Sequence, residues 1–108
     1  NLYFKQSEPE ILPASFDELN DLANILSENK NIEIQIEGHT DNSGNAEDLL
    51  TLSEKRAEAV KIFLVNKNIK PFRITSKGFG GTKPVHENPK TEAERQANRR
   101  VEIRILKK

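Results

Sequence analysis

The sequence of 108 residues contains no cysteine and no tryptophan, and it has only one tyrosine. Without cysteine the chain has neither disulfide bonds nor thiolate ligands for a metal ion. The scarcity of large aromatic side chains argues against a surface on which nucleic-acid bases stack. The fold must therefore depend on an ordinary apolar core, for which a chain of this length is sufficient.

The sequence also lacks an excess of charge of either sign and any long apolar run. Its 17 basic residues balance its 17 acidic residues, so no net field favours nucleic acid or an anionic membrane as a partner. No stretch approaches the roughly 20 apolar residues of a transmembrane helix, and no signal peptide opens the sequence. We expect residues 1–108 to form one domain that does not insert into a membrane, excised from a longer exported protein.

Helical and strand patterns alternate along the chain. Apolar residues at helical spacing predict a helix with Ser15 as its N-cap and Glu18 completing a capping box. Further helices are predicted over residues 45–66 and 91–97, and strands over residues 2–5, 32–37, 72–79 and 100–105. We predict an α/β (α+β) two-layer sandwich, in which a mixed four-stranded sheet carries helices on one face in the order β-α-β-α-β-α-β.

One positive charge lies within the apolar stripe of the helix predicted over residues 45–66. At about 100° per residue, Arg56 points within roughly 20° of the direction of Leu49 and Val60. Arginine is rarely buried without an anionic partner, because an unpaired charge loses its hydration. Asp41, in the turn before this helix, is the best candidate. Arg56 can reach toward it because helical side chains lean toward the N-terminus.

A second arginine is expected near the same turn. Arg99 shares the parity of the apolar side chains in the last strand, and an antiparallel last strand would begin near Asp41. Two guanidinium groups and a carboxylate held apart by the fold would form a receptor for a zwitterion, with Asp41 binding an ammonium and Arg56 a carboxylate. Two simpler interpretations stay open. Asp41 and Arg56 pair with each other to fix the turn, or Arg99 is only a charge at a strand edge.

Three separated motifs resemble those of a known family. They are Gly38-His39-Thr40-Asp41-Asn42-x-Gly44, Leu52-Ser53-x-x-Arg56-Ala57-x-x-Val60-x-x-x-Leu64 and Asn98-Arg99-Arg100-Val101-Glu102. Their order and spacing resemble the OmpA-like C-terminal peptidoglycan-binding domain, a family that includes domains of the peptidoglycan-associated lipoprotein and of flagellar motor stator proteins. The resemblance extends over nearly the whole chain.

The resemblance implies non-covalent binding of the peptidoglycan stem peptide, typically through diaminopimelate, whose side chain ends in an ammonium and a carboxylate on one carbon. By their positions in the motifs, Asp41 and Arg56 would hold this zwitterion. Thr40 and Asn42 would add hydrogen bonds, largely from the backbone, and Arg99 a secondary contact. The domain would tether an outer-membrane or envelope protein to the wall from the periplasm, without catalysis, cofactor or metal.

Two positions depart from the family pattern. The family usually has asparagine where this chain has Leu49, and often an aspartate in the loop after the first strand, where Ser7 is the best-aligned residue. Both departures remove polar contacts around the ligand. An alternative function is therefore a protein–protein interaction module of the envelope with weak or no peptidoglycan binding. A wall hydrolase is a further alternative, but no carboxylate pair or nucleophile has convincing spacing for it.

Two weaker signals remain. His39 and His86 are far apart in the sequence and have no third ligand at metal-binding spacing. We therefore expect no metal site and no acid–base pair, and we interpret His39 as orienting its turn through a hydrogen bond. The segment Gly78-x-Gly80-Gly81 is not followed directly by a helix, so it predicts a flexible turn rather than a phosphate-binding loop.

Overall fold

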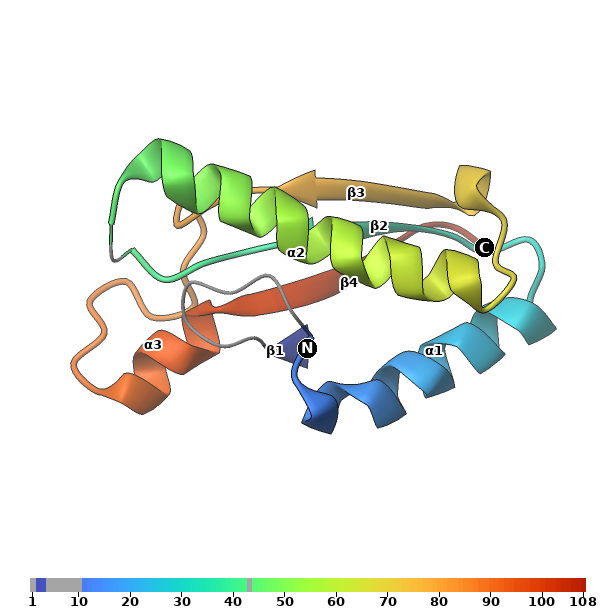
Figure 1. Ribbon diagram of the computed structural model, residues 1–108, viewed down its shortest axis with the longest axis horizontal. Coiled ribbons are helices and arrows are strands. Elements are labelled where there is room, and N and C mark those ends of the chain that lie inside the picture. Colours follow the sequence, from blue (N-terminus) through green and yellow to red (C-terminus); the bar gives the residue numbers. More distant parts are fainter. Residues whose placement is uncertain (1, 4–10, 43) are drawn as a thin grey trace.

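The computed structural model describes residues 2–3, 11–42 and 44–108. Seven helices and strands follow one another in the described part of the chain, with two short 3-10 turns over Pro13–Ser15 and Pro71–Arg73 (Figure 1). They are β1 (Leu2–Tyr3), α1 (Phe16–Glu28), β2 (Glu33–Gly38), α2 (Ala46–Asn66), β3 (Ile74–Gly78), α3 (Glu92–Asn98) and β4 (Arg100–Lys107). The mixed α+β architecture predicted from the sequence is confirmed.

The sheet brings the ends of several elements together at one end of the molecule. Its strand order is β1-β4-β2-β3, with β2 parallel to β3 and β4 antiparallel to both β1 and β2. Gly38, the last residue of β2, pairs with Gly78 at the end of β3 and with Val101 near the start of β4. The loops that follow β2 and β3 therefore meet the start of β4 at one end of the sheet, as Figure 1 shows.

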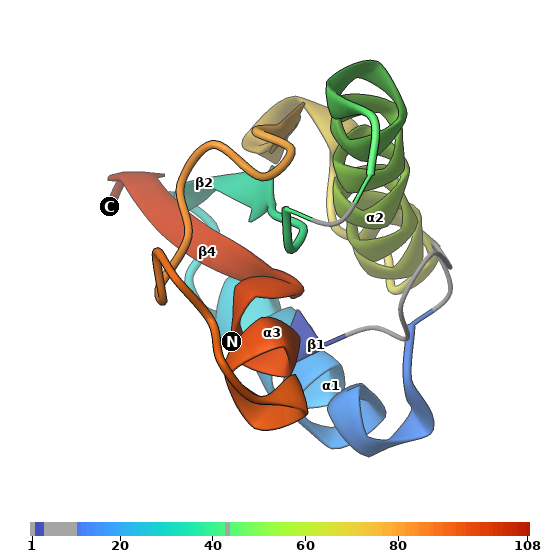
Figure 2. The same cartoon turned by 90° about the vertical axis from the view of Figure 1, so that its left-hand side faces the viewer.

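Helices α1 and α2 cover one face of the sheet, and α3 lies at the end where β4 begins (Figures 1 and 2). The alternation in β2 directs Ile34 and Ile36 into the core beneath the helices and turns the charged residues to the other face. Among the described residues, no helix is both long and apolar enough to cross a membrane. The buried apolar core is formed by Leu2, Leu19, Ala23, Leu26, Ile34, Ile36, Ala57, Val60, Leu64, Ile69, Ile74 and Val101.

The ends of three elements differ from the sequence predictions. Ser15 is the N-cap of α1, but its side chain makes no capping hydrogen bond, because a 3-10 turn leads directly into the helix. The predicted capping box is therefore wrong. The strand expected from Phe72 begins only at Ile74, since Pro71 starts another 3-10 turn. The last strand continues to Lys107. Residues 4 and 5 of the expected first strand lie outside the described residues.

Helix α2 begins at a true side-chain cap and then passes very close to the sheet. The Asn45 side chain accepts hydrogen bonds from the backbone N–H groups of Glu47 and Asp48, at 2.9 and 3.2 Å. Farther along, a Cβ atom at Gly38 would lie 2.1 Å from the Ser53 carbonyl oxygen. This close approach positions α2 directly over the end of β2 and so over the turn that follows it.

Replacing Gly38 should therefore destabilise the fold. In Gly38→Ala the new methyl group meets helix backbone, which cannot rotate away, so we expect the free energy of unfolding to fall by about 1–3 kcal/mol or more. Urea denaturation followed by circular dichroism measures this change. Ser27→Ala, an exposed substitution in α1, is the control and should stay within about 0.5 kcal/mol of the parent chain. Equal stability of the two variants would contradict the close packing.

Candidate functional site

The turn after β2 is fixed by backbone hydrogen bonds to both neighbouring segments. The His39 N–H donates to the Arg100 carbonyl at 2.8 Å, and the Thr40 N–H donates to the Gly80 carbonyl at 2.9 Å. The Thr40 hydroxyl is buried and has no hydrogen-bond partner among the described residues. Thr40 therefore contributes to the turn through the hydrogen bond of its backbone N–H. The turn thus presents the next residue, Asp41, from a defined position.

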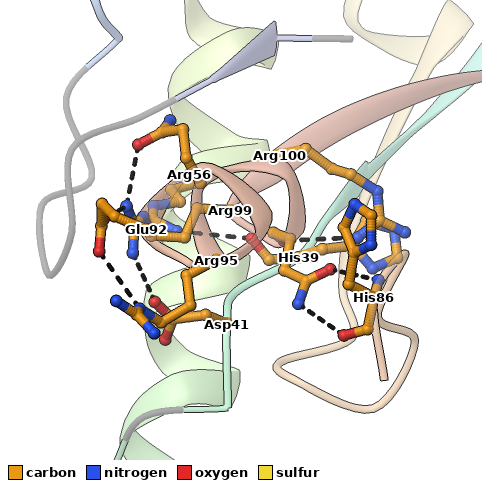
Figure 3. Close-up of polar contacts among 10 residues, drawn as sticks. His39, Asp41, Arg56, His86, Glu92, Arg95, Arg99 and Arg100 are labelled. Atoms are coloured by element: carbon orange, nitrogen blue, oxygen red, sulfur yellow. Dashed lines mark hydrogen bonds and ion pairs between the residues drawn. The ribbon is translucent and has the colours of Figure 1, made fainter. Parts of the chain in front are cut away.

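Asp41 forms a buried ion pair with Arg99. The Arg99 Nη1 donates to Asp41 Oδ2 at 2.7 Å, and each side chain is only 4% exposed (Figure 3). The other terminal nitrogen of Arg99 bonds the Glu92 carboxylate and, at 2.9 Å, the Gln96 side-chain oxygen. The expected proximity of Arg99 to Asp41 is confirmed. Arg99 lies at the C-cap of α3, one residue before β4, so it is not merely a charge at a strand edge.

Arg56 lies beneath the same turn and is 0% exposed, which confirms its predicted burial. Its Nη1 donates to the His39 carbonyl oxygen at 3.4 Å (Figure 3). Arg56 therefore helps to fix the turn through its backbone. Burial, and next the charge of Arg99, lower the pKa of Arg56 to about 10, while Asp41 opposes the shift. At neutral pH the guanidinium stays protonated.

Asp41, Arg56 and Arg99 together form what we call the buried charge cluster, which holds two cations and one anion. Burial alone would lower the pKa of Arg99, but its hydrogen bonds to Glu92 and Asp41 raise it above its ordinary value. Hydrogen bonds from Arg99 and then Arg95 lower the pKa of Glu92. Glu92 thus connects the buried ion pair to the surface, where its carboxylate lies 3.2 Å from the Arg95 Nε.

A hollow of about 460 Å³ opens beside the cluster. Of the residues proposed from the sequence, Asp41 and the exposed Asn42 line it, whereas Thr40, Arg56 and Arg99 are not among its described lining residues. The buried Leu49 lies in the first turn of α2, and Ser7 lies outside the described residues. Among the described residues, the lining is formed by Asp41, Asn42, Glu87, Asn88, Pro89, Lys90 and Arg95.

Sequence reasoning missed the cations of the hollow, Lys90 and Arg95. They lie in an irregular polar loop and on a short helix, where no periodic pattern distinguishes them from other surface charges. Asn98 holds this wall in place: its side-chain oxygen accepts from the N–H groups of Val85 and His86 at 2.8 and 3.0 Å, and its amide donates to the His86 carbonyl at 3.0 Å. Asn98 is itself buried.

His39 contributes to the turn through its backbone and not through its ring. Its backbone takes part in the turn, but its two ring nitrogens are buried and have no hydrogen-bond partner among the described residues. The ring stacks on Phe79, with centroids 5.4 Å apart. Burial, and next the charge of Arg100, lower the pKa of His39. The hydrogen bonds through which His39 fixes the turn are therefore made by its backbone. The glycine-rich segment after β3 forms the expected turn at Gly80 and Gly81.

The ion pair of Arg99 should matter more for stability than the exposed pair of Arg95. Arg99→Met leaves the Asp41 carboxylate buried without its principal cation, so we expect the free energy of unfolding to fall by about 3–5 kcal/mol. Arg95→Met is the matched control, and its loss should be about 1 kcal/mol or less because water screens its pair with Glu92. Urea denaturation checks both. Similar losses in the two variants would contradict the structural role of Arg99.

Comparison with known proteins places this geometry in a family. A model of the OmpA family matches residues 3–99. The chain is 37% identical over 95 residues to outer membrane porin F of Pseudomonas fluorescens, covering 88% of this chain and 29% of that protein. It is 34% identical over 102 residues to the peptidoglycan-associated lipoprotein of Buchnera aphidicola, covering 94% and 59%. The chain thus spans less than two thirds of these relatives.

Solved structures share the fold. The peptidoglycan-associated lipoprotein of Burkholderia pseudomallei superposes with a TM-score of 0.86 at 27% identity, over 99% of this chain and 88% of that chain. The C-terminal domain of Helicobacter pylori MotB also gives a TM-score of 0.86, at 24% identity and over 96% and 81% of the two chains; at that identity it supports the fold alone. From the family match and the sequence relatives, this chain belongs to the OmpA family.

Proposed function

We propose that this domain binds the stem peptide of peptidoglycan without forming a covalent bond, and that it recognises the zwitterionic end of diaminopimelate. In this way it tethers an outer-membrane or other envelope protein to the cell wall from the periplasm. The observation that carries the proposal is the position of Asp41, which lines an open hollow while two buried arginines lie behind it. Membership of the OmpA family, with a peptidoglycan-associated lipoprotein among the relatives, supports it.

Asp41 is the proposed partner of the ligand's ammonium group. A carboxylate offers about four acceptor sites, so one that is bonded to an arginine can still accept from an ammonium. Charge-assisted bonds of this kind are shorter and stronger than neutral ones. Arg99 holds the Asp41 side chain in one orientation, so little conformational freedom is lost when the ligand binds. Asn42 and the backbone around Thr40 would add neutral hydrogen bonds.

The ligand's carboxylate is proposed to lie on the side of the guanidinium groups. The positive field of these guanidinium groups attracts an anion, and it acts more strongly in a poorly solvated place than in bulk water. Arg56 supplies this field from beneath the turn and also fixes the turn through the His39 carbonyl. Lys90 and Arg95, which line the hollow, offer direct bonds to the carboxylate at the surface.

The alternative is a protein–protein interaction module of the envelope that keeps the fold and binds peptidoglycan weakly or not at all. Leu49 favours this alternative, because it is buried in α2 where the family pattern usually offers a polar amide. The same binding experiments distinguish the two functions. In neither is a bond of the wall broken.

Removing the charge of Asp41 should weaken wall binding. Asp41→Asn keeps the shape of the side chain but cannot pair with an ammonium, so we expect at least a tenfold loss (about 1.4 kcal/mol) in affinity for purified sacculi. Co-sedimentation with sacculi measures it, and circular dichroism verifies the fold. Asp21→Asn, an exposed change of the same charge on α1, should bind like the parent. Unchanged binding by Asp41→Asn would contradict the proposal.

The same site should discriminate between stem peptides that differ at the third residue. Lysine carries the side-chain ammonium but lacks the second carboxylate, so we expect its peptide to bind about tenfold more weakly than the diaminopimelate peptide. Isothermal titration of the domain with both peptides measures the ratio. If Lys90 and Arg95 take the carboxylate, the variant Arg95→Gln should show a smaller ratio than the parent. Equal affinity of the parent for both peptides would argue against recognition of the zwitterion.

A further inference from the structure

Three potential metal ligands come together on the face of the sheet that the helices leave uncovered. Glu37 and Glu102 are direct partners across β2 and β4, and both point away from the core because their neighbours Ile36 and Val101 point into it. His39 follows two residues after Glu37 and has the same parity. One ring nitrogen of His39 and one carboxylate oxygen from each glutamate lie within 4.8 Å of one another.

The imidazole of His39 gives this cluster a second, independent feature. Its side chain is 2% exposed, and neither ring nitrogen has a hydrogen-bond partner among the described residues. Buried polar groups in folded proteins almost always have a partner. The stacking on Phe79 fixes the plane of the ring. A buried, unpartnered imidazole aimed at two carboxylates is an arrangement that a metal ion would satisfy.

The sequence, in which the two histidines have no third ligand at metal-binding spacing, led us to expect no metal site, but the cross-strand register of β2 and β4 supplies two further ligands. We propose that Glu37, His39 and Glu102 bind a divalent transition-metal ion such as Zn²⁺. Imidazole nitrogen and carboxylate oxygen are both ligands that Zn²⁺ accepts, and three protein ligands leave the fourth tetrahedral position to water. Zinc bonds of about 2.0–2.1 Å place tetrahedral ligand atoms roughly 3.4 Å apart. The ligand atoms, now within 4.8 Å of one another, must therefore approach by up to about 1.4 Å, which rotation of the long glutamate side chains provides. Their two negative charges are shared with Arg100, which pairs with Glu102, and with Arg104, which lies 3.8 Å from Glu37, so the ion competes with these two arginines.

Side chains next to the proposed metal site have two opposite effects on it: one orients a ligand, and another competes with the ion. The Gln35 side-chain amide donates to Glu37 at 2.7 Å, which orients that carboxylate. Arg100 donates to Glu102 at 2.5 Å and competes with a cation for it, so the ion must displace this bond or use the other oxygen.

The proposed metal site shares no residue with the lining of the hollow and does not depend on the wall-binding function. The two are nevertheless joined through one residue. The carbonyl oxygen of His39 accepts the hydrogen bond from Arg56, and its N–H donates to Arg100. An ion that holds the His39 side chain would therefore also restrain the turn that carries Asp41.

Titration of the chain with Zn²⁺, without an added histidine tag, tests the inference. Isothermal titration should show one ion per chain, and saturating Zn²⁺ should raise the melting temperature, because the ion binds the folded state. Affinity should fall at least tenfold in His39→Gln and in Glu102→Gln. The second variant keeps the test decisive if the first does not fold, since the Glu102 side chain is 38% exposed.

Two controls make the outcome specific. His86→Gln removes a surface histidine that lies 3.6 Å from Glu94, and it should leave the affinity for Zn²⁺ unchanged. Mg²⁺, which prefers oxygen ligands alone, should bind far more weakly than Zn²⁺. The inference is overturned if millimolar Zn²⁺ does not saturate the parent chain. It is also overturned if Glu102→Gln binds as tightly as the parent, if His86→Gln removes the binding, or if Mg²⁺ binds equally well.

Discussion

The ion pair between Asp41 and Arg99 is the constraint on which this end of the molecule depends. Both groups are almost completely removed from water, and a buried charge is tolerated only when it is paired and hydrogen-bonded. Arg56, a second buried cation, is compatible with that pair because Asp41 lies near enough to oppose the repulsion from Arg99. The geometry of the turn is thus fixed by charge as well as by its backbone hydrogen bonds.

The sheet makes that constraint possible. The antiparallel register of β2 and β4 pairs Gly38 with Val101, and this pairing brings Arg99, at the end of α3, against the turn after β2. The close approach of α2 to Gly38 places Arg56 beneath the same turn. Segments that are far apart in the sequence thereby assemble one site at the carboxyl ends of the parallel strands, a common place for ligands in open sheets.

Periodicity predicted most of the elements, the burial of Arg56 and the approach of Arg99 to Asp41, because these follow from helix and strand geometry alone. It failed at Ser15 and Phe72, where proline-led 3-10 turns replace the expected cap and the first residues of a strand. It also failed for features that depend on tertiary contacts. The cation Lys90 lies in an irregular loop and Arg95 on the short helix α3, and the surroundings of the His39 ring depend on a cross-strand register that no local pattern encodes.

The hydrogen bonds that Asn98 makes with Val85 and His86, where the loop that lines the hollow begins, have a kinetic consequence for the proposed binding. Because one wall of the hollow is already ordered, a guest need not wait for a rearrangement, and its arrival is governed by diffusion and orientation. A contact made from a few polar bonds also dissociates quickly. Lasting attachment to a polymer would then require many copies of the domain bound at once. Each single domain could dissociate and bind again as the polymer is remodelled.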